Sequence, residues 1–189
     1  MANKIFAGVD EVGRGCLAGP VISCALILKK NINKKFLRDS KTIAFKDRIE
    51  IAKHIKKNSW YAIGLASVDE IDKYNIFNAT LLSMERAVKK LKKKPHLFLI
   101  DGTHAPKKLK NSKTIIKGDQ KIKCISAASI VAKAYRDLYM IKLGNKFPEY
   151  KWNKNFGYGT WQHLGALKKF GVTNYHRKSY KPVHNILSK

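Results

Sequence analysis

The sequence is poor in acidic residues and in cysteine. Only 13 Asp and Glu stand against 39 Lys and Arg in 189 residues, which gives a formal net charge of +26. The three cysteines, Cys16, Cys24 and Cys124, form no Cys-x-x-Cys pair. This excludes the usual zinc motifs and argues against a disulfide framework. We therefore expect a protein of a reducing compartment, the cytoplasm.

Long apolar runs are also missing. No stretch approaches the roughly 18 apolar residues that a membrane-spanning helix needs, and the first acid arrives before any segment long enough for a signal peptide. We expect no membrane association. The hydrophobic share of 44% is that of a folded protein, and the length supports one domain, or one domain with a small appendage.

Arginine is scarce among the basic residues. Six of the 39 are arginine and 33 are lysine, although the planar guanidinium is the better bidentate partner for phosphates and bases. The charge makes a nucleic acid a natural partner. A lysine-rich codon bias in an AT-rich genome is the alternative source of the excess.

Apolar periodicity predicts alternating strands and helices. Strands are expected at 4–9, 20–28, 60–67, 96–102 and 114–116, and helices at 43–57, 75–94, 126–143 and 160–171. This alternation predicts an α/β fold with a helical C-terminal portion. We divide the chain into a catalytic core, residues 1–145, and a C-terminal helical segment, residues 146–189, within one compact domain.

Four of the few acids stand where apolar strands end. Asp10 and Glu11 close the first strand, Asp101 closes the fourth, and Asp119 follows the fifth. Because strand ends of an α/β sheet converge at one edge, these four carboxylates are expected to share a small volume. The alternative is that each is a turn residue or is neutralised by a lysine, which is more credible for Asp119 than for the adjacent pair.

Clustered carboxylates repel one another unless a cation lies between them. Oxygen ligands without His or Cys favour Mg²⁺ or Mn²⁺ over Zn²⁺. Two such ions can hold both the attacking water and the leaving oxygen of a phosphodiester cleavage. An acid cluster in a basic protein therefore predicts a metal-dependent nuclease.

Ordered blocks along the chain resemble the ribonuclease HII family. They are residues 8–21 (GVDEVGRGCLAGPV), 39–41 (DSK), 99–102 (LIDG), 117–119 (KGD), 126–133 (SAASIVAK), 136–137 (RD), 157–160 (GYGT) and 176–180 (HRKSY). The resemblance implies a ribonuclease H-like fold, a central mixed sheet flanked by helices, with a C-terminal helical segment that helps to clamp the substrate. It also implies an endonuclease that cuts RNA in RNA–DNA hybrids and incises DNA 5′ of an embedded ribonucleotide, leaving a 3′-hydroxyl and a 5′-phosphate.

The resemblance assigns roles to the same four acids and to a substrate-binding set. Asp10, Glu11 and Asp101 would form the metal cage, with Asp119 more peripheral. Gly13, Arg14 and Gly15 would read the 2′-hydroxyl, since glycines let the backbone approach closely. Tyr158 would stack on the sugar beside the scissile position, and Lys41 would bind a backbone phosphate. As alternatives, the glycines are turn residues, Tyr158 packs in its loop, and Lys41 is one solvated lysine among 33.

Three further residues are interpreted as structural. Asp137, beside Arg136 in a predicted helix, is expected to be a buried salt-bridge partner. His163 and His176 are taken as packing residues rather than proton shuttles, because water activated by a metal needs no histidine.

Two rival functions remain. One is a non-catalytic protein that binds RNA or hybrids through its basic surface, although such a binder has no use for clustered acids where phosphates must approach. The other is a nuclease that acts only on long hybrids, as type I or type III enzymes do. Arg14 between the two glycines favours type II. We expect a monomer, and no clamp-binding motif is evident in the tail.

Overall fold

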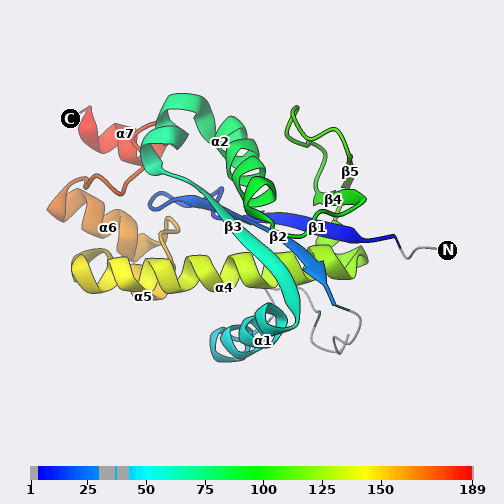
Figure 1. The fold of residues 1–189 in the computed structure, drawn as a ribbon. Coiled ribbons are helices and arrows are strands. Elements are labelled where there is room, and N and C mark those ends of the chain that lie inside the picture. The colour runs from blue at the N-terminus through cyan, green and yellow to red at the C-terminus, as the bar shows by residue number, and fades with distance from the viewer. Residues whose placement is uncertain (1–3, 30–36, 38–42, 189) are drawn as a thin grey trace.

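A five-stranded mixed sheet forms the centre of the molecule (Figure 1). The computed structural model describes residues 4–29, 37 and 43–188. The strand order is β3-β2-β1-β4-β5, with β1 antiparallel to β2 and parallel to β4. The strands are β1 (Phe6–Val12), β2 (Val21–Leu28), β3 (Ser59–Ala66), β4 (Leu97–Asp101) and β5 (Ser112–Ile115). The predicted α/β class is confirmed.

Helices cover both faces of this sheet. They are α1 (Phe45–Lys57), α2 (Val68–Lys90), α3 (Gly118–Lys121), α4 (Lys123–Lys146), the 3-10 turn η2 (Pro148–Tyr150), α5 (Trp152–Asn155), α6 (Trp161–Phe170) and α7 (Lys181–Leu187). α2 lies on one face, and α1 and α4 lie on the other (Figure 1). β2 is therefore covered by α2 on one side and by α1 and α4 on the other.

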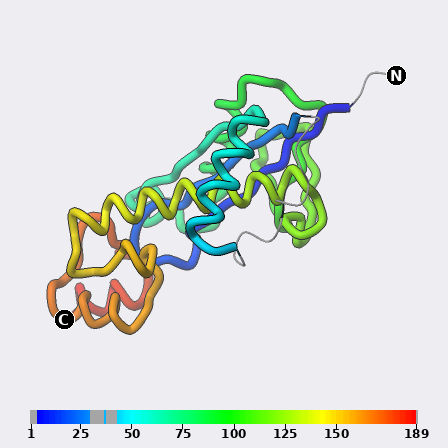
Figure 2. The backbone as a smooth tube through the Cα atoms, turned by 90° about the horizontal axis from the view of Figure 1, so that it is seen from below, coloured from blue at the N-terminus to red at the C-terminus, as the bar shows by residue number. Residues whose placement is uncertain are grey.

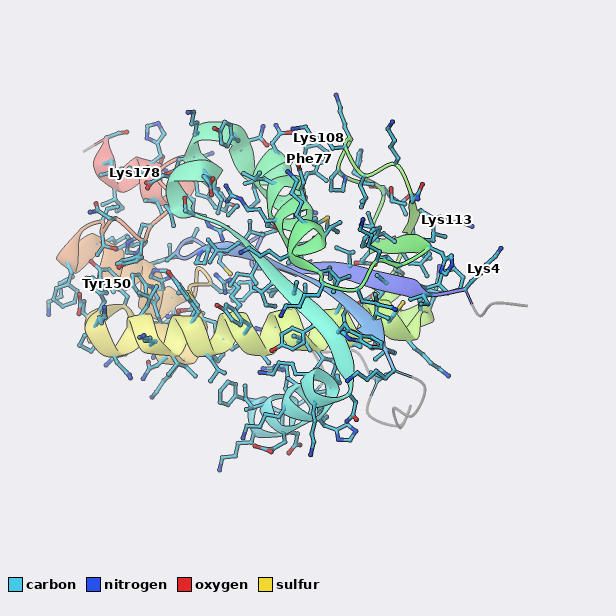
Figure 3. The ribbon with its side chains drawn as sticks, viewed as in Figure 1. Lys4, Phe77, Lys108, Lys113, Tyr150 and Lys178 are labelled. Carbon is cyan, nitrogen blue, oxygen red and sulfur yellow. The ribbon has the colours of Figure 1, made fainter. Side chains whose placement is uncertain are left out.

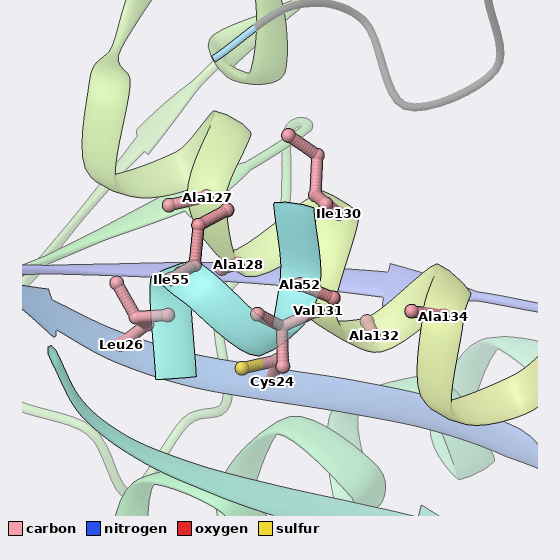
Figure 4. Close-up of a cluster of buried hydrophobic side chains, with 10 residues drawn as sticks. All are labelled: Cys24, Leu26, Ala52, Ile55, Ala127, Ala128, Ile130, Val131, Ala132 and Ala134. Carbon is pink, nitrogen blue, oxygen red and sulfur yellow. The ribbon is translucent and has the colours of Figure 1, made fainter. Parts of the chain in front are cut away.

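Alternation along β2 explains this double covering. Cys24 and Leu26 pack against α1 and α4, while Ala25 and Ile27 join the cluster under α2, as the two-residue period of a strand requires. Figure 4 shows the first cluster, with Ile55 of α1 over β2. A strand such as β2, in which only Ser23 is polar, is typical of a sheet buried on both faces.

Helix α2 starts seven residues earlier than the predicted residue 75. Ser67 caps it in a reciprocal box, in which its side chain accepts from the Glu70 N–H and the Glu70 carboxylate accepts from the Ser67 N–H. The backbone leaves helical geometry at Asn75 (φ 63°), whose side chain accepts a bond from the N–H of Asn78. The sequence prediction thus found the second segment and missed the first, although Ser67 and Glu70 have the spacing of a capping box.

The C-terminal segment packs on the core through its own apolar cluster. Trp152 and Tyr150 are buried there against Leu17, Met140 and Leu143. Figure 2 shows the C-terminal helices gathered at one end of the molecule and the start of β1 at the other. Because this cluster draws on both sides of residue 146, the division into two parts stays a proposal.

Asp137 is fully buried in α4 and carries two ion pairs. It binds Arg48 of α1 at 2.9 Å and Lys133 of α4 at 2.7 Å, so the expected buried salt bridge is present. The adjacent Arg136 is not a partner of Asp137, because its guanidinium donates to backbone carbonyls instead. The ion pairs join α1 to α4.

Lysines cover several sides of the surface. Lys4, Lys108 and Lys113 lie towards one end of the molecule and Lys178 at the other, and all four are exposed (Figure 3). Within the described ranges, every helix is too short or too polar to cross a bilayer.

Candidate active site

Two neighbouring parallel strands carry three of the four acids. Asp10 and Glu11 lie in the second half of β1, and Asp101 is the last residue of β4. The register that pairs Val9 with Ile100 brings Asp10 level with Asp101. Parallel strands present their carboxyl ends at one edge of the sheet, where ligand sites of α/β proteins form. The expected convergence of these three acids is therefore present in the backbone.

Asp119 reaches the same place from another element. The chain leaves β5, passes through Lys117 in the left-handed conformation (φ 55°), and places Asp119 in the first turn of α3. All four acids line one cavity of about 180 Å³, whose other walls are Val12, Ser129, Lys133 and Tyr158. The structure thus brings together the four predicted carboxylates and one predicted substrate-binding residue, Tyr158.

The two acids of β1 are held at an electrostatic cost. Asp10 is only 5% exposed; burial raises its pKa well above 3.8, and the charge of Glu11 raises it further against a hydrogen bond from Ser129. Burial also raises the pKa of Glu11, opposed by the Arg14 guanidinium. Desolvated carboxylates beside one another favour protonation or a bound cation.

Basic side chains do not neutralise the centre of this cluster. Lys133 lines the cavity, but its Nζ pairs with Asp137. Arg14 lies 3.4 Å from Glu11 Oε1 with its side chain 51% exposed. Among the residues that the structure describes, no ion pair involves Asp10 or Asp101. The alternative that lysines neutralise these acids is therefore not met at the two central positions.

The donor set fits hard divalent cations. Every titratable oxygen in the cavity apart from the tyrosine belongs to a carboxylate, and no His or Cys lines it, which selects Mg²⁺ or Mn²⁺. In the described part of the chain, no three His, Cys, Asp or Glu side chains already stand close enough to hold an ion.

The loop after β1 contains the predicted Gly13, Arg14 and Gly15. Gly13 has a φ of +95°, and a Cβ there would lie 2.1 Å from Nε of Arg136, so this position requires glycine. A Cβ at Gly15 would meet open space. Arg14 and Gly15 are exposed and Gly13 is buried. The loop therefore presents its tip to solvent next to Glu11.

Tyr158 projects from a loop with an unusual backbone. Phe156 and Gly157 both have positive φ, and the carbonyl of Tyr158 bonds Nδ1 of buried His163 at 2.9 Å. The Tyr158 ring is 41% exposed and lies 5.9 Å from Nζ of Lys133. The ring is thus held at the cavity rim with one part accessible. Lys41, the remaining predicted substrate-binding residue, lies outside the described residues.

Sequence reasoning missed two buried arginines. Arg136 donates to the carbonyls of Ala18, Pro20 and Phe156, and Arg177 donates to those of Gly13, Arg14 and Gly19. Their rarity was the available signal, because the chain has 33 lysines and only six arginines, and arginine offers a planar set of five donors that lysine lacks.

Two further cavities of the described residues differ in how they relate to the acid cluster. One, of about 290 Å³, shares Glu11 and Asp101 with it and continues past Arg14 towards His104 and Phe77 of α2 (Figure 3). The second, of about 880 Å³, lies at the opposite end of β1, around Lys4 and Trp60, and its described lining includes no acid. The cavity of about 180 Å³ is the one that all four predicted acids line.

Comparison with known proteins shows the family of this chain. The family model described as Ribonuclease HII matches residues 7–183. A curated relative named Ribonuclease HII, from Pelagibacter ubique (strain HTCC1062), is 56% identical over 186 residues, covering 97% of this chain and all of the relative. Another, from Macrococcus caseolyticus, is 46% identical over 98% of this chain and 70% of its own length.

Solved structures show the same fold. The ribonuclease H2 of Pyrococcus horikoshii OT3 aligns with a TM-score of 0.82 at 24% identity, over 97% of both chains. Ribonuclease HII of Archaeoglobus fulgidus, solved in a complex with PCNA, aligns at 0.79 and 22% identity over 94% of this chain and 95% of that one. Bst-RNase HIII, solved with Mn²⁺, aligns at 0.74 and 14% identity over 98% of this chain and 70% of that one. The chain therefore belongs to the ribonuclease HII family and is a metal-dependent endoribonuclease of RNA–DNA hybrids with the ribonuclease H fold.

Proposed function

We propose that this chain also incises duplex DNA on the 5′ side of an embedded ribonucleotide, using two divalent ions, Mg²⁺ or Mn²⁺. The observation that carries the proposal is the convergence of Asp10, Glu11, Asp101 and Asp119 on one cavity in a protein of charge +26. A protein that only bound nucleic acid would not place four acids where phosphates approach.

The four carboxylates would hold the ions, with Asp119 the most peripheral. The chemistry that divalent ions would supply there is activation of the attacking water and stabilisation of the leaving 3′ oxygen, which would leave a 3′-hydroxyl and a 5′-phosphate. The chain supplies the rest by its own side chains. Asp10 takes part in no ion pair of the described residues. No basic side chain there therefore competes with a cation for its carboxylate oxygens.

Recognition of the ribonucleotide would use the loop and the tyrosine at the cavity rim. Gly13, Arg14 and Gly15 follow Glu11 closely, and Arg14 and Gly15 are exposed residues. The backbone of this loop would bind the 2′-hydroxyl, which both donates and accepts hydrogen bonds. Tyr158 would stack on the adjacent sugar. Lys41 would contact a backbone phosphate.

The chain would act as a monomer in the cytoplasm, where its three free, buried cysteines remain reduced. The Archaeoglobus protein was solved with PCNA, whereas no clamp-binding motif is evident in residues 175–189 of this sequence.

The test uses a DNA duplex with one ribonucleotide, an all-RNA strand paired with DNA, and an all-DNA duplex. Each is incubated with Mn²⁺, with Mg²⁺ and with EDTA, and the product ends are mapped. The proposal predicts a metal-dependent nick 5′ of the single ribonucleotide, with 3′-hydroxyl and 5′-phosphate ends. Cleavage of the hybrid alone would instead identify an enzyme restricted to long hybrids.

A further inference from the structure

One buried side chain, Arg177, binds both ends of the loop of residues 13–20, which connects β1 to β2. The guanidinium of Arg177, from the segment before α7, donates to the carbonyl of Gly13 at 2.6 Å and to that of Arg14 at 2.7 Å. It also donates to the carbonyl of Gly19, from Nη2 at 2.8 Å and from Nε at 3.0 Å. Arg177 is fully buried. A single residue therefore holds the loop where it leaves β1 and where it enters β2.

Neighbours of Arg177 hold it in this position. Its Nη1 also donates to the hydroxyl of Tyr180 at 3.0 Å, and this hydroxyl donates to the carbonyl of Arg14. The backbone N–H of Arg177 donates to the carbonyl of Leu17 at 2.8 Å. The guanidinium is thus anchored on the same loop that it organises.

These bonds fix the direction of the peptide groups of the loop. The carbonyls of Gly13 and Arg14 point inward to Arg177, whereas Arg14 and Gly15 are exposed. Among the hydrogen bonds of the described residues, none uses the N–H of Arg14 or of Gly15. Successive backbone N–H groups left free in a turn form a site for an electronegative oxygen.

We propose that Arg177, with Tyr180, is a positioning residue for recognition of the 2′-hydroxyl. By taking the carbonyls of Gly13 and Arg14, it leaves the N–H groups of the loop facing the sugar next to the acid cluster. The inference rests on the proposed function and assigns a specificity role to a side chain that does not touch the substrate. Lysine cannot replace it, because an ammonium lacks the planar set of five donors that reaches three carbonyls.

The test compares Arg177→Lys and Tyr180→Phe with the control Asp72→Asn. Asp72 anchors the same segment by accepting from the N–H groups of Lys178 and Ser179, but it has no bond to the loop in the described structure. For each variant, kcat/KM is measured on the DNA duplex with one ribonucleotide and on the all-RNA hybrid, well below the melting temperature. The readout is the ratio of the two, in which any loss of folded enzyme cancels.

We expect Arg177→Lys to lower this ratio about tenfold, the effect of one lost charge-assisted hydrogen bond, and Tyr180→Phe to lower it less. On the duplex with a single ribonucleotide, only one binding position places a 2′-hydroxyl at the loop, whereas on the hybrid every position does. A loosened loop should therefore lower kcat/KM more on the first substrate. Asp72→Asn should keep the wild-type ratio even where it lowers the melting temperature.

An unchanged ratio in Tyr180→Phe and in Arg177→Lys would overturn the proposal, whatever their total activity. If Arg177→Lys does not fold, Tyr180→Phe decides alone. A wild-type protein that cuts the hybrid but not the single ribonucleotide contradicts the proposed function instead, and that result is visible before any variant is made.

Discussion

The backbone N–H of Gly118 donates a hydrogen bond of 2.7 Å to Oδ1 of Asp101. This bond joins the end of β4 to the start of α3, and it orients the Asp101 carboxylate next to Asp119 of the following turn. Two acids that are 18 residues apart in sequence are thereby placed around one cavity. Hydrogen bonds that orient a metal ligand in this way usually have a large effect on metal affinity.

Substituting Gly118 tests this support. A Cβ at Gly118 would lie 2.6 Å from Cδ1 of Ile125 and 3.3 Å from Oδ1 of Asp101, so Gly118→Ala displaces the carboxylate. We expect Mn²⁺ affinity, measured by calorimetry, to fall about tenfold. Gly165→Ala in α6 is the matched control, because a Cβ there meets nothing within 4 Å; equal Mn²⁺ affinity in the two variants would argue against the role of this bond.

Asp10→Asn should stabilise the protein when no metal is present. Burial and the charge of Glu11 raise the pKa of Asp10 in the folded protein above its ordinary value of 3.8. The stability that protonated Asp10 contributes is therefore fully present below pH 3.8 and is lost as pH rises through the raised pKa. At neutral pH the ionised form thus opposes folding. Removing the charge should raise the melting temperature in EDTA by about 2 to 4 °C, the shift that about 1 kcal/mol produces at this size.

The same variant should lose its response to metal. Mn²⁺ stabilises a protein that binds it only when folded, so the wild-type melting temperature should rise with Mn²⁺ while that of Asp10→Asn stays near its EDTA value. Equal Mn²⁺-induced shifts would mean that Asp10 is not a ligand.

Acid should destabilise the fold through His176. The N–H of Thr173 donates to His176 Nδ1, so the proton of this ring lies on Nε2 and points to His163 Nε2 at 3.0 Å. Burial lowers the pKa of His176 from 6.5 to about 3. The unfolded chain therefore binds a proton that the folded chain does not, and stability falls as pH drops below 6.5 towards 3.

The measurement is the free energy of unfolding from pH 7 to pH 5 in wild type, His176→Asn and the surface control His184→Gln. The difference between wild type and His176→Asn should change by up to about 1.4 kcal/mol per pH unit, while His184→Gln should parallel wild type. Parallel curves for all three would refute the interpretation.

The buried ion pairs of Asp137 should matter far more than a surface pair. Asp137→Ala removes the carboxylate from between Arg48 and Lys133, and we expect a loss of about 3 to 5 kcal/mol in urea unfolding. Glu50→Ala removes an exposed pair with Lys53 and should cost about 1 kcal/mol or less. Similar losses in both variants would contradict the assignment.

The sequence predicted the part of the site that local patterns encode. Asp10, Glu11 and Asp101 each follow an apolar run that becomes a strand, and parallel strands end at one edge, so their meeting could be inferred from the residue pattern alone. Asp119 required one more step, since it lies in α3 rather than in a turn. The start of α2 was predictable from Ser67 and Glu70, but apolar periodicity alone does not reveal it.

The roles of the arginines could not be predicted. Arg177 bonds Gly13 across 164 residues, and Arg48 bonds Asp137 across 89. Such pairings depend on how the C-terminal segment and α1 dock on the core, and no local periodicity carries that information. For the same reason Asp137 could be identified as a buried acid while its partners stayed unknown.

The central claim is that the acid cluster cuts and the basic surface binds. The most direct measurement places wild type and Asp10→Asn on the same DNA duplex with one ribonucleotide, and follows cleavage in Mn²⁺ together with binding by fluorescence anisotropy. We predict that Asp10→Asn binds within about threefold of wild type, because binding depends on lysines at the phosphates, and that its cleavage is abolished. Cleavage by Asp10→Asn at the wild-type rate would contradict the account.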